Sequence, residues 1–268
     1  MTNAEQPQEG GAAAGGRVVF GVHPIEELLR VRPREIAVLY VADGTRSPDI
    51  DRVVRLAKDR AVPTEYRPRA LVADLAGAPA HQGLVALAGA YNYASLDEVF
   101  AAITKAGVPG LVLVLDGITD PHNFGALVRS AEVLGAHGVV IAQRAAAPVT
   151  GTVVKASAGA TERMRIAAVP NLLKTIDALR GRGLRVLGAA VGDKSPSLDT
   201  VDLRGPVGLV VGAEGQGMRE AVARRCDGLF HIPQRGVIGS LNASVAGAIA
   251  LYEVARQRRG DSGAGSPT

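Results

Sequence analysis

Three strongly apolar segments constrain the fold of this chain more than any other feature of its sequence. They read LVLVLD at residues 111–116, GVVIA at 138–142 and VGLVVGAE at 207–214. A strand that is apolar at nearly every position is buried on both faces, which is typical of parallel sheets covered by helices. Segments with helical spacing lie between them, so we predict a parallel-sheet α/β domain over residues 110–260.

The same alternation occurs on a smaller scale nearer the N-terminus and predicts a second, small α/β domain at residues 17–92. Strands are expected at 35–42, 62–66 and 84–91, and helices after Pro24, from Pro48 to Asp59 and over 69–76. Residues 93–109 hold one helix candidate and a Gly-Val-Pro break, and are predicted to be a linker or a first helix leading into the second domain. Both ends of the chain, 1–16 and 261–268, lack aliphatic periodicity and are predicted to be disordered tails.

Composition narrows the cellular setting and the classes of partner. The single cysteine, Cys226, fits a reducing cytoplasm and argues against a disulfide scaffold or a cysteine cluster. No apolar run reaches the roughly 20 residues of a membrane helix, and the start, MTNAEQPQEG, lacks the basic and apolar parts of a secretory signal. Residues 17–92 hold eleven basic against nine acidic residues, and 93–260 hold nineteen against fourteen, so both predicted domains allow a polyanionic partner.

The 33 glycines raise the question of a nucleotide-binding fold, but the usual motifs are missing. There is no G-x-G-x-x-G after a strand and no Gly-Lys dipeptide, which argues against a dinucleotide-binding fingerprint and a P-loop. The sequence also has no H-E-x-x-H and no G-x-S-x-G, and its five histidines are scattered. We therefore expect neither a metal site nor a serine nucleophile.

The first candidate site is the loop that joins the strand at 111–116 to the next helix. In open α/β sheets, ligands bind beyond the carboxyl ends of strands, where this loop is expected to lie. Asn123 is expected to cap the helix, and capping alone would explain it. Arg129 lies among apolar residues of that helix and is expected to need an anionic partner, because an unpaired buried guanidinium is costly.

Two further loops carry polar groups. The segment 212–218 has three glycines that let the backbone approach a ligand closely, and its Glu214 could accept hydrogen bonds from one. A tight strand–helix turn would explain the same glycines. In the third loop, Ser240 is the expected N-cap of the C-terminal helix. Asn242 is then expected in the first turn, where its helix propensity is poor and a ligand-binding role explains it better.

These loops resemble the motifs of the SpoU, or TrmH-like, branch of the SPOUT RNA methyltransferases. The pattern D-P-x-N-x-G-x-x-x-R matches Asp120 to Arg129, G-x-E-G-x-G matches Gly212 to Gly217, and I-P…S-L-N-x-S-x-A matches Ile232 to Ala246. Lys155 to Ala160 resembles another family segment. Phe20 to Pro24 and His81 to Gly83 resemble signatures of a small N-terminal substrate-binding domain found in ribosomal RNA guanosine methyltransferases of the family.

The resemblance implies S-adenosylmethionine (AdoMet)-dependent methylation of an RNA ribose 2′-hydroxyl, by a dimer whose C-terminal segment forms a trefoil knot. It also implies that Arg129 is the central catalytic residue, which we interpret as binding the phosphate beside the target ribose and stabilising the developing alkoxide. The other catalytic residues would be Asn123, Glu214, Ser240 and Asn242. The cofactor would contact Gly212, Gly217, Ile232, Ser240 and Leu241, and Gln234 stands where Met is common.

The N-terminal domain favours ribosomal RNA as the substrate, and a guanosine of the large-subunit RNA in particular. A transfer RNA ribose methyltransferase of the same family and a non-catalytic RNA-binding or ribosome-assembly protein remain as alternatives. The chain has only nine aromatic residues, which favours RNA contacts through phosphate and ribose over stacking on bases. Neither a metal nor a membrane is expected as a partner.

Overall fold

The computed structural model describes residues 16–78, 80–144, 146–190, 194–236 and 239–261. The chain forms two compact units, one comprising Met1–Asn92 with Val149–Glu162 and the other Tyr93–Pro148 with Arg163–Thr268. The predicted tails, 1–16 and 261–268, lie outside the described residues except for Gly16 and Asp261. Within the described part of the chain, no helix is long and apolar enough to cross a membrane.

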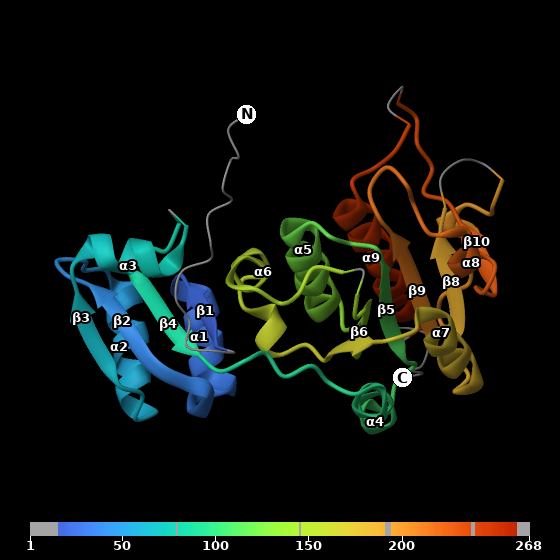
Figure 1. The fold of residues 1–268 in the computed structure, drawn as a ribbon. Coiled ribbons are helices and arrows are strands. Elements are labelled where there is room, and N and C mark those ends of the chain that lie inside the picture. The colour runs from blue at the N-terminus through green and yellow to red at the C-terminus, as the bar shows by residue number, and fades with distance from the viewer. Residues whose placement is uncertain (1–15, 79, 145, 191–193, 237–238, 262–268) are drawn as a thin grey trace, which may run out of the picture. The chain divides into compact units, whose positions relative to one another are not determined.

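The second unit is built on a six-stranded parallel sheet with the order β10-β8-β9-β5-β6-β7 (Figure 1). Its strands are β5 (Leu111–Asp116), β6 (Gly138–Ala142), β7 (Ile166–Val169), β8 (Arg185–Ala189), β9 (Val207–Gly212) and β10 (Gly228–Phe230). The three apolar segments form β5, β6 and β9, and every residue of these strands is buried. The predicted parallel-sheet α/β fold is confirmed.

Helices cover both faces of this sheet (Figure 1). They are α4 (Leu96–Ala106), α5 (Pro121–Val133), α7 (Leu172–Gly181), α8 (Glu220–Ala223) and α9 (Ala243–Asp261), with a short 3₁₀ turn η3 (Leu198–Thr200). Buried side chains of α4, α7 and α8 share one core with Val112 and Val114 of β5. On the other face α9 packs closely on α5, because a Cβ at Gly247 would lie only 2.3 Å from Cδ2 of Leu127. The first turn of α5 carries Asn123, and Asn242 lies just before α9.

The first unit has a four-stranded mixed sheet with the order β1-β4-β2-β3. Its elements are β1 (Arg17–Phe20), α1 (Val22–Val31), η1 (Pro33–Glu35), β2 (Ile36–Ala42), α2 (Pro48–Asp59), β3 (Thr64–Arg67), α3 (Arg69–Ala76) and β4 (Leu84–Ala88). Helix α3 packs on one face of the sheet through Val72 and Ala76, which share a core with Ala42 and Val85. The four-residue β1 has no counterpart among the predicted strands.

The connection between β6 and β7 packs in the first unit, although it lies within the range 110–260 predicted for the second domain. It contains α6 (Gly151–Ala156) and η2 (Ala160–Glu162). A Cβ at Gly151 would lie 2.2 Å from the carbonyl oxygen of Val18, so α6 approaches β1 this closely because it has a glycine there. At η2, the Glu162 carboxylate accepts two hydrogen bonds from the Arg17 guanidinium, at 2.7 and 2.9 Å. These contacts between distant parts of the sequence place the segment in the first unit.

The predicted linker at 93–109 is largely helical in the structure. Residues 96–106 form α4, which begins with a capping box between Ser95 and Glu98. Val99 and Phe100 of this helix are buried in the core of the second unit. The segment is therefore part of that unit, because its apolar face packs on the sheet.

Three segments that carry the family resemblance meet in the first unit. The Gln82 side-chain oxygen accepts hydrogen bonds from the Val22 amide at 3.2 Å and from Nζ of Lys155 at 2.6 Å. Gly21 has a positive φ of 93°, and a Cβ there would lie 2.4 Å from Nζ of Lys155. Burial lowers the pKa of Lys155. The segments 20–24, 81–83 and 155–160, which are far apart in the sequence, are thus neighbours in the fold.

Candidate active site

The strand order places two of the candidate loops side by side. β5 and β6 continue the sheet in one direction and β9 and β8 in the other, so the strand order reverses between β5 and β9. The register pairs Asp116, the last residue of β5, with Gly212, the last residue of β9. The loops that follow these strands therefore leave the sheet together, at the kind of switch point where open α/β sheets bind ligands.

The glycine loop after β9 folds back on itself so closely that no side chain fits at its start. A Cβ at Gly212 would lie 2.1 Å from the Met218 amide nitrogen, and the Gly217 amide donates to the Ala213 carbonyl at 2.8 Å. Gly215 and Gly217 have φ values of 77° and 67°, a conformation that favours glycine. The first and last glycines of the predicted motif thus form the tight turn.

Asp116 binds the residue that follows this loop, Arg219. The sequence alone did not lead to a role for Asp116. Its buried carboxylate accepts hydrogen bonds from the backbone amide of Arg219 at 2.8 Å and from Nε of the same residue at 2.7 Å. A carboxylate at the end of an entirely apolar strand needs such a partner, because an unpaired buried charge is costly. Its position at the end of the LVLVL run is the signal from which such a partner could have been predicted.

One polar network joins the three candidate loops. The Nδ2 amide of Asn123 donates to Oε2 of Glu214 at 3.2 Å. The Nδ2 amide of Asn242 donates to the same oxygen at 3.2 Å and to Oδ1 of Asn123 at 2.9 Å. Three of the five predicted catalytic residues, from segments 91 and 28 residues apart, are therefore in direct contact.

The prediction that Asn123 caps α5 is wrong. The N-cap is Asp120, whose carboxylate accepts hydrogen bonds from the backbone amides of His122 and Asn123, at 3.0 and 3.3 Å. Pro121 occupies the first helical position, where its missing N–H costs nothing. Asn123 consequently lies inside the first turn, buried, and its side chain is available for Glu214.

The prediction that Ser240 caps the last helix is also wrong. α9 begins at Ala243, and the Oδ1 oxygen of Asn242 accepts hydrogen bonds from the amides of Ser244 and Val245, at 2.9 and 3.3 Å. Asn242 thus precedes the helix and caps it, rather than lying in its first turn. Ser240, two residues earlier, is exposed and faces the cavity described below.

Arg129 has a different setting from the one predicted. It is exposed on α5, and it makes no ion pair or hydrogen bond with any described residue, so the structure does not join it to the network of Asn123, Glu214 and Asn242. The expectation that this guanidinium is buried is therefore wrong. A solvated, unpaired guanidinium is instead free to pair with a phosphate of a bound molecule.

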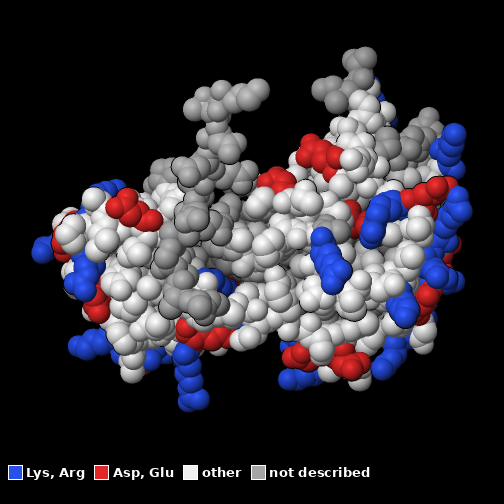
Figure 2. All heavy atoms as spheres, in the orientation of Figure 1, with Lys and Arg blue, Asp and Glu red and all other residues white. Residues whose placement is uncertain are grey.

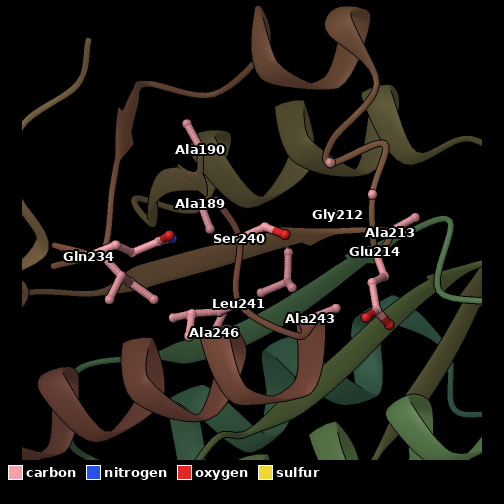
Figure 3. Close-up of a pocket in the computed structure, with 14 residues that line it drawn as sticks. Ala189, Ala190, Gly212, Ala213, Glu214, Gln234, Ser240, Leu241, Ala243 and Ala246 are labelled. Carbon is pink, nitrogen blue, oxygen red and sulfur yellow. The ribbon is translucent and has the colours of Figure 1, made fainter. Parts of the chain in front are cut away.

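A cavity opens between the carboxyl ends of β8 and β9 and the start of α9 (Figure 3). All five residues predicted to contact the cofactor line it: Gly212, Gly217, Ile232, Ser240 and Leu241. Small apolar side chains form much of the remaining wall, among them Ala189, Ala190, Ala213, Ala243 and Ala246. The polar lining includes the Gln234 amide and the Glu214 carboxylate, which Figure 3 shows at opposite ends of the labelled residues.

Two family models match the chain, one over most of each unit. Residues 110–252 match the SpoU rRNA methylase family, and residues 18–94 match the domain described as RNA 2′-O ribose methyltransferase substrate binding. The chain belongs to the SpoU rRNA methylase family. It is therefore an RNA ribose methyltransferase, and the resemblance carried by the three loops is confirmed.

Individual relatives match over both units. The 23S rRNA (guanosine-2′-O-)-methyltransferase RlmB of Pseudomonas aeruginosa is 39% identical over 243 residues, which cover 90% of this chain and 96% of that protein. An uncharacterised tRNA/rRNA methyltransferase of Mycolicibacterium smegmatis is 38% identical over 257 residues, covering 96% of this chain and 81% of that one. The structure is also similar to the SpoU methyltransferase AviRb of Streptomyces viridochromogenes, solved with AdoMet, with a TM-score of 0.77, 26% identity and 92% of each chain covered.

Proposed function

We propose that this protein transfers a methyl group from AdoMet to the ribose 2′-hydroxyl of a guanosine in 23S ribosomal RNA, in the cytoplasm. The observation that carries the substrate assignment is the match to RlmB over 90% of this chain, which includes the N-terminal substrate-binding unit as well as the methyltransferase unit. The relatives named for both tRNA and rRNA leave transfer RNA as the alternative substrate.

The cavity at β8, β9 and α9 has the lining that AdoMet requires. Gly212 lines the cavity with backbone alone, and the alanines at 189 and 190 leave room for a flat ring. The carboxamide of Gln234 has no hydrogen-bond partner among the described residues and faces the same space (Figure 3). When bound there, AdoMet supplies an activated methyl group on its sulfonium.

The protein's own part in the reaction is to position the ribose and stabilise charge. We assign to Arg129 the binding of the phosphate beside the target ribose and the stabilisation of the developing alkoxide. A protonated guanidinium has no lone pair to accept a proton, so the proton of the 2′-hydroxyl passes to that phosphate or to water. Asn123, Glu214 and Asn242 form a hydrogen-bonded side-chain network at the cavity, and Ser240 lines the part of it where the cofactor would bind.

The surface charge agrees with contacts spread along an RNA. Figure 2 shows Lys and Arg over the visible face of both units, interspersed with Asp and Glu rather than gathered in one stripe. Many arginines of the chain are in surface ion pairs, such as Arg180 with Asp227 and Arg204 with Asp202. Unpaired cations such as Arg129 are therefore better placed to contact phosphates.

Ribose-methylation mapping of ribosomal and transfer RNA tests the proposed substrate. In a strain without this gene, we expect one guanosine of 23S rRNA to lose its 2′-O-methyl group while transfer RNA is unchanged. Restoring the gene should restore the mark. A mark lost from transfer RNA would favour the alternative substrate, and an unchanged pattern in both RNAs would favour a non-catalytic RNA-binding protein.

We further propose a homodimer in which a second copy covers the outer faces of α5 and α9. Four large apolar side chains are exposed there: Val133 (70%), Val245 (45%), Ile249 (36%) and Tyr252 (51%). The groove between the two helices is lined by alanines, serines, Val245, Ile249 and Tyr252, with no charged group among the described residues that line it. Such a face is complementary to itself and suits a two-fold contact.

Ile249→Asp is expected to weaken the dimer by about tenfold or more, because a carboxylate would be desolvated in an apolar contact. Sedimentation equilibrium over a range of protein concentrations measures the effect. Val108→Asp, at an exposed apolar residue (57%) outside this face, is the matched control. A wild-type chain that stays monomeric at micromolar concentration, or equal dissociation constants for both variants, would contradict the proposed interface. The trefoil knot implied by the resemblance also remains a proposal.

A further inference from the structure

The side-chain amide of Asn242 can be oriented in only one way. Its Oδ1 accepts hydrogen bonds from the Ser244 amide (2.9 Å), the Ser244 hydroxyl (2.6 Å) and the Val245 amide (3.3 Å). Its Nδ2 donates to Oδ1 of Asn123 and Oε2 of Glu214. Rotating the amide by 180° would turn the NH₂ group toward two backbone N–H donors and the oxygen toward the Glu214 carboxylate, and these groups cannot exchange donor and acceptor roles.

The orientation of the Asn242 amide also determines which groups of Asn123 and Glu214 face each other. Because Oδ1 of Asn123 accepts from Asn242, the NH₂ group of Asn123 is left facing Glu214. Glu214 receives both amides on Oε2, and its Oε1 has no hydrogen-bond donor among the described residues. Since Glu214 lines the cofactor cavity, that oxygen is available to a bound molecule.

We propose that Ser244 is a positioning residue for methyl transfer, whose hydroxyl fixes the Asn242 amide and through it the direction of Asn123 and Glu214. Among the three donors to Oδ1 of Asn242, the Ser244 hydroxyl makes the shortest hydrogen bond and is the only side chain. Ser244 is not among the residues that line the cofactor cavity, but lines the groove between α5 and α9. It therefore acts through Asn242 and does not touch the cofactor.

Single substitutions at Ser244 give the first test. Ser244→Ala is expected to lower kcat about three- to tenfold, in the range of one lost hydrogen bond, with the KM for AdoMet within twofold of wild type. Ser244→Thr keeps the hydroxyl and should restore kcat to within twofold. Ser130→Ala is the matched control, because Ser130 lines the same groove but bonds only to the Ala126 carbonyl. Wild-type kcat in Ser244→Ala, or an equal loss in Ser130→Ala, would overturn the proposal.

A double-mutant cycle distinguishes positioning from a general structural effect. If Ser244 acts through Asn242, then Ser244→Ala should change single-turnover rates less than twofold in an Asn242→Ala background. A loss of the same size in both backgrounds would show that Ser244 acts independently of Asn242, and the proposal would be wrong. Dimer mass should be measured for each variant, since Ser244 lies on the face proposed for the second copy.

The kinetic tests rest on the proposed RNA substrate, whereas a spectroscopic one does not. The side-chain NH₂ resonances of Asn242 and Asn123 report their hydrogen bonds directly in the full chain. Ser244→Ala is expected to shift both resonances and to speed their exchange with water, while Ser130→Ala leaves both unchanged. Unshifted amides in Ser244→Ala would overturn the proposal even if the chain proved active on a different RNA, and shifted amides would support it even then.

Discussion

Arg129→Lys is expected to lower the rate of ribose methylation by about 100-fold or more, while the affinity for AdoMet stays within about twofold. Arg129 is exposed and unpaired among the described residues, so its substitution breaks no contact within the protein. Lysine keeps the charge but loses the planar fork of donors that pairs with two phosphate oxygens. The loss should therefore appear in catalysis on RNA and leave folding intact.

Steady-state methylation of 23S rRNA and calorimetry with AdoMet together measure this effect. Arg144→Lys provides the control, because Arg144 is likewise exposed and follows β6 at the same edge of the sheet. Near wild-type turnover in Arg129→Lys would show that the guanidinium fork has no part in the reaction. Loss of AdoMet binding would instead place Arg129 in the cofactor site, contrary to the role assigned to it here.

Helix and strand positions were most predictable where local rules agree with burial. α2 begins and ends where predicted, from Pro48 to Asp59, because Ser47 caps it, Pro48 suits its first position and its apolar spacing is regular. β5 and β6 also match their predicted bounds, since an apolar run ends where the chain leaves a buried sheet. The convergence of the loops after β5 and β9 follows from the switch-point rule for open sheets.

The errors arose where two residues satisfy the same local rule. Asp120 and Asn123 are both good N-caps, as are Ser240 and Asn242, so propensity alone does not choose between them. Pro121 could have decided the first case, because proline favours the first helical position and so makes Asp120 the cap. For Arg129, helical geometry could have helped: it points about 100° away from Val128 and about 200° away from Leu127 around a helix.

Membership of residues 149–162 in the first unit could not be predicted from local sequence. The decisive contacts are those of Gly151 with the Val18 carbonyl and of Glu162 with Arg17, which join segments more than 130 residues apart. Nothing in the spacing near Glu162 distinguishes a buried carboxylate from a surface one. Only the folded chain shows that its side chain is wholly buried and paired.

That buried pair leads to the largest expected effect on stability. Arg17→Ala is expected to lower the free energy of unfolding of the first unit by about 3–5 kcal/mol, because it leaves the Glu162 carboxylate buried without its partner. The arginine also lies over the Tyr91 ring, with Cζ 5.1 Å from the ring centre, so packing is lost as well as charge. Urea denaturation of the full chain, followed by tyrosine fluorescence and circular dichroism, measures the change.

Two further variants distinguish the effect of losing the Arg17–Glu162 ion pair from the effect of shortening the side chain. Glu35 also accepts a hydrogen bond from Arg17, at 3.2 Å, but its side chain is 24% exposed, so Glu35→Ala should cost less than about 1 kcal/mol. Removing both charges, as Arg17→Met with Glu162→Leu, should recover most of the stability lost in Arg17→Ala, because similar apolar side chains avoid the desolvation of an unpaired carboxylate. If the double variant were no more stable than Arg17→Ala, the penalty would lie in lost packing around Arg17 and not in the stranded charge. Recovery would instead show that the loss in Arg17→Ala comes from the unpaired Glu162 carboxylate, and that apolar contact can hold the β6–β7 segment against β1.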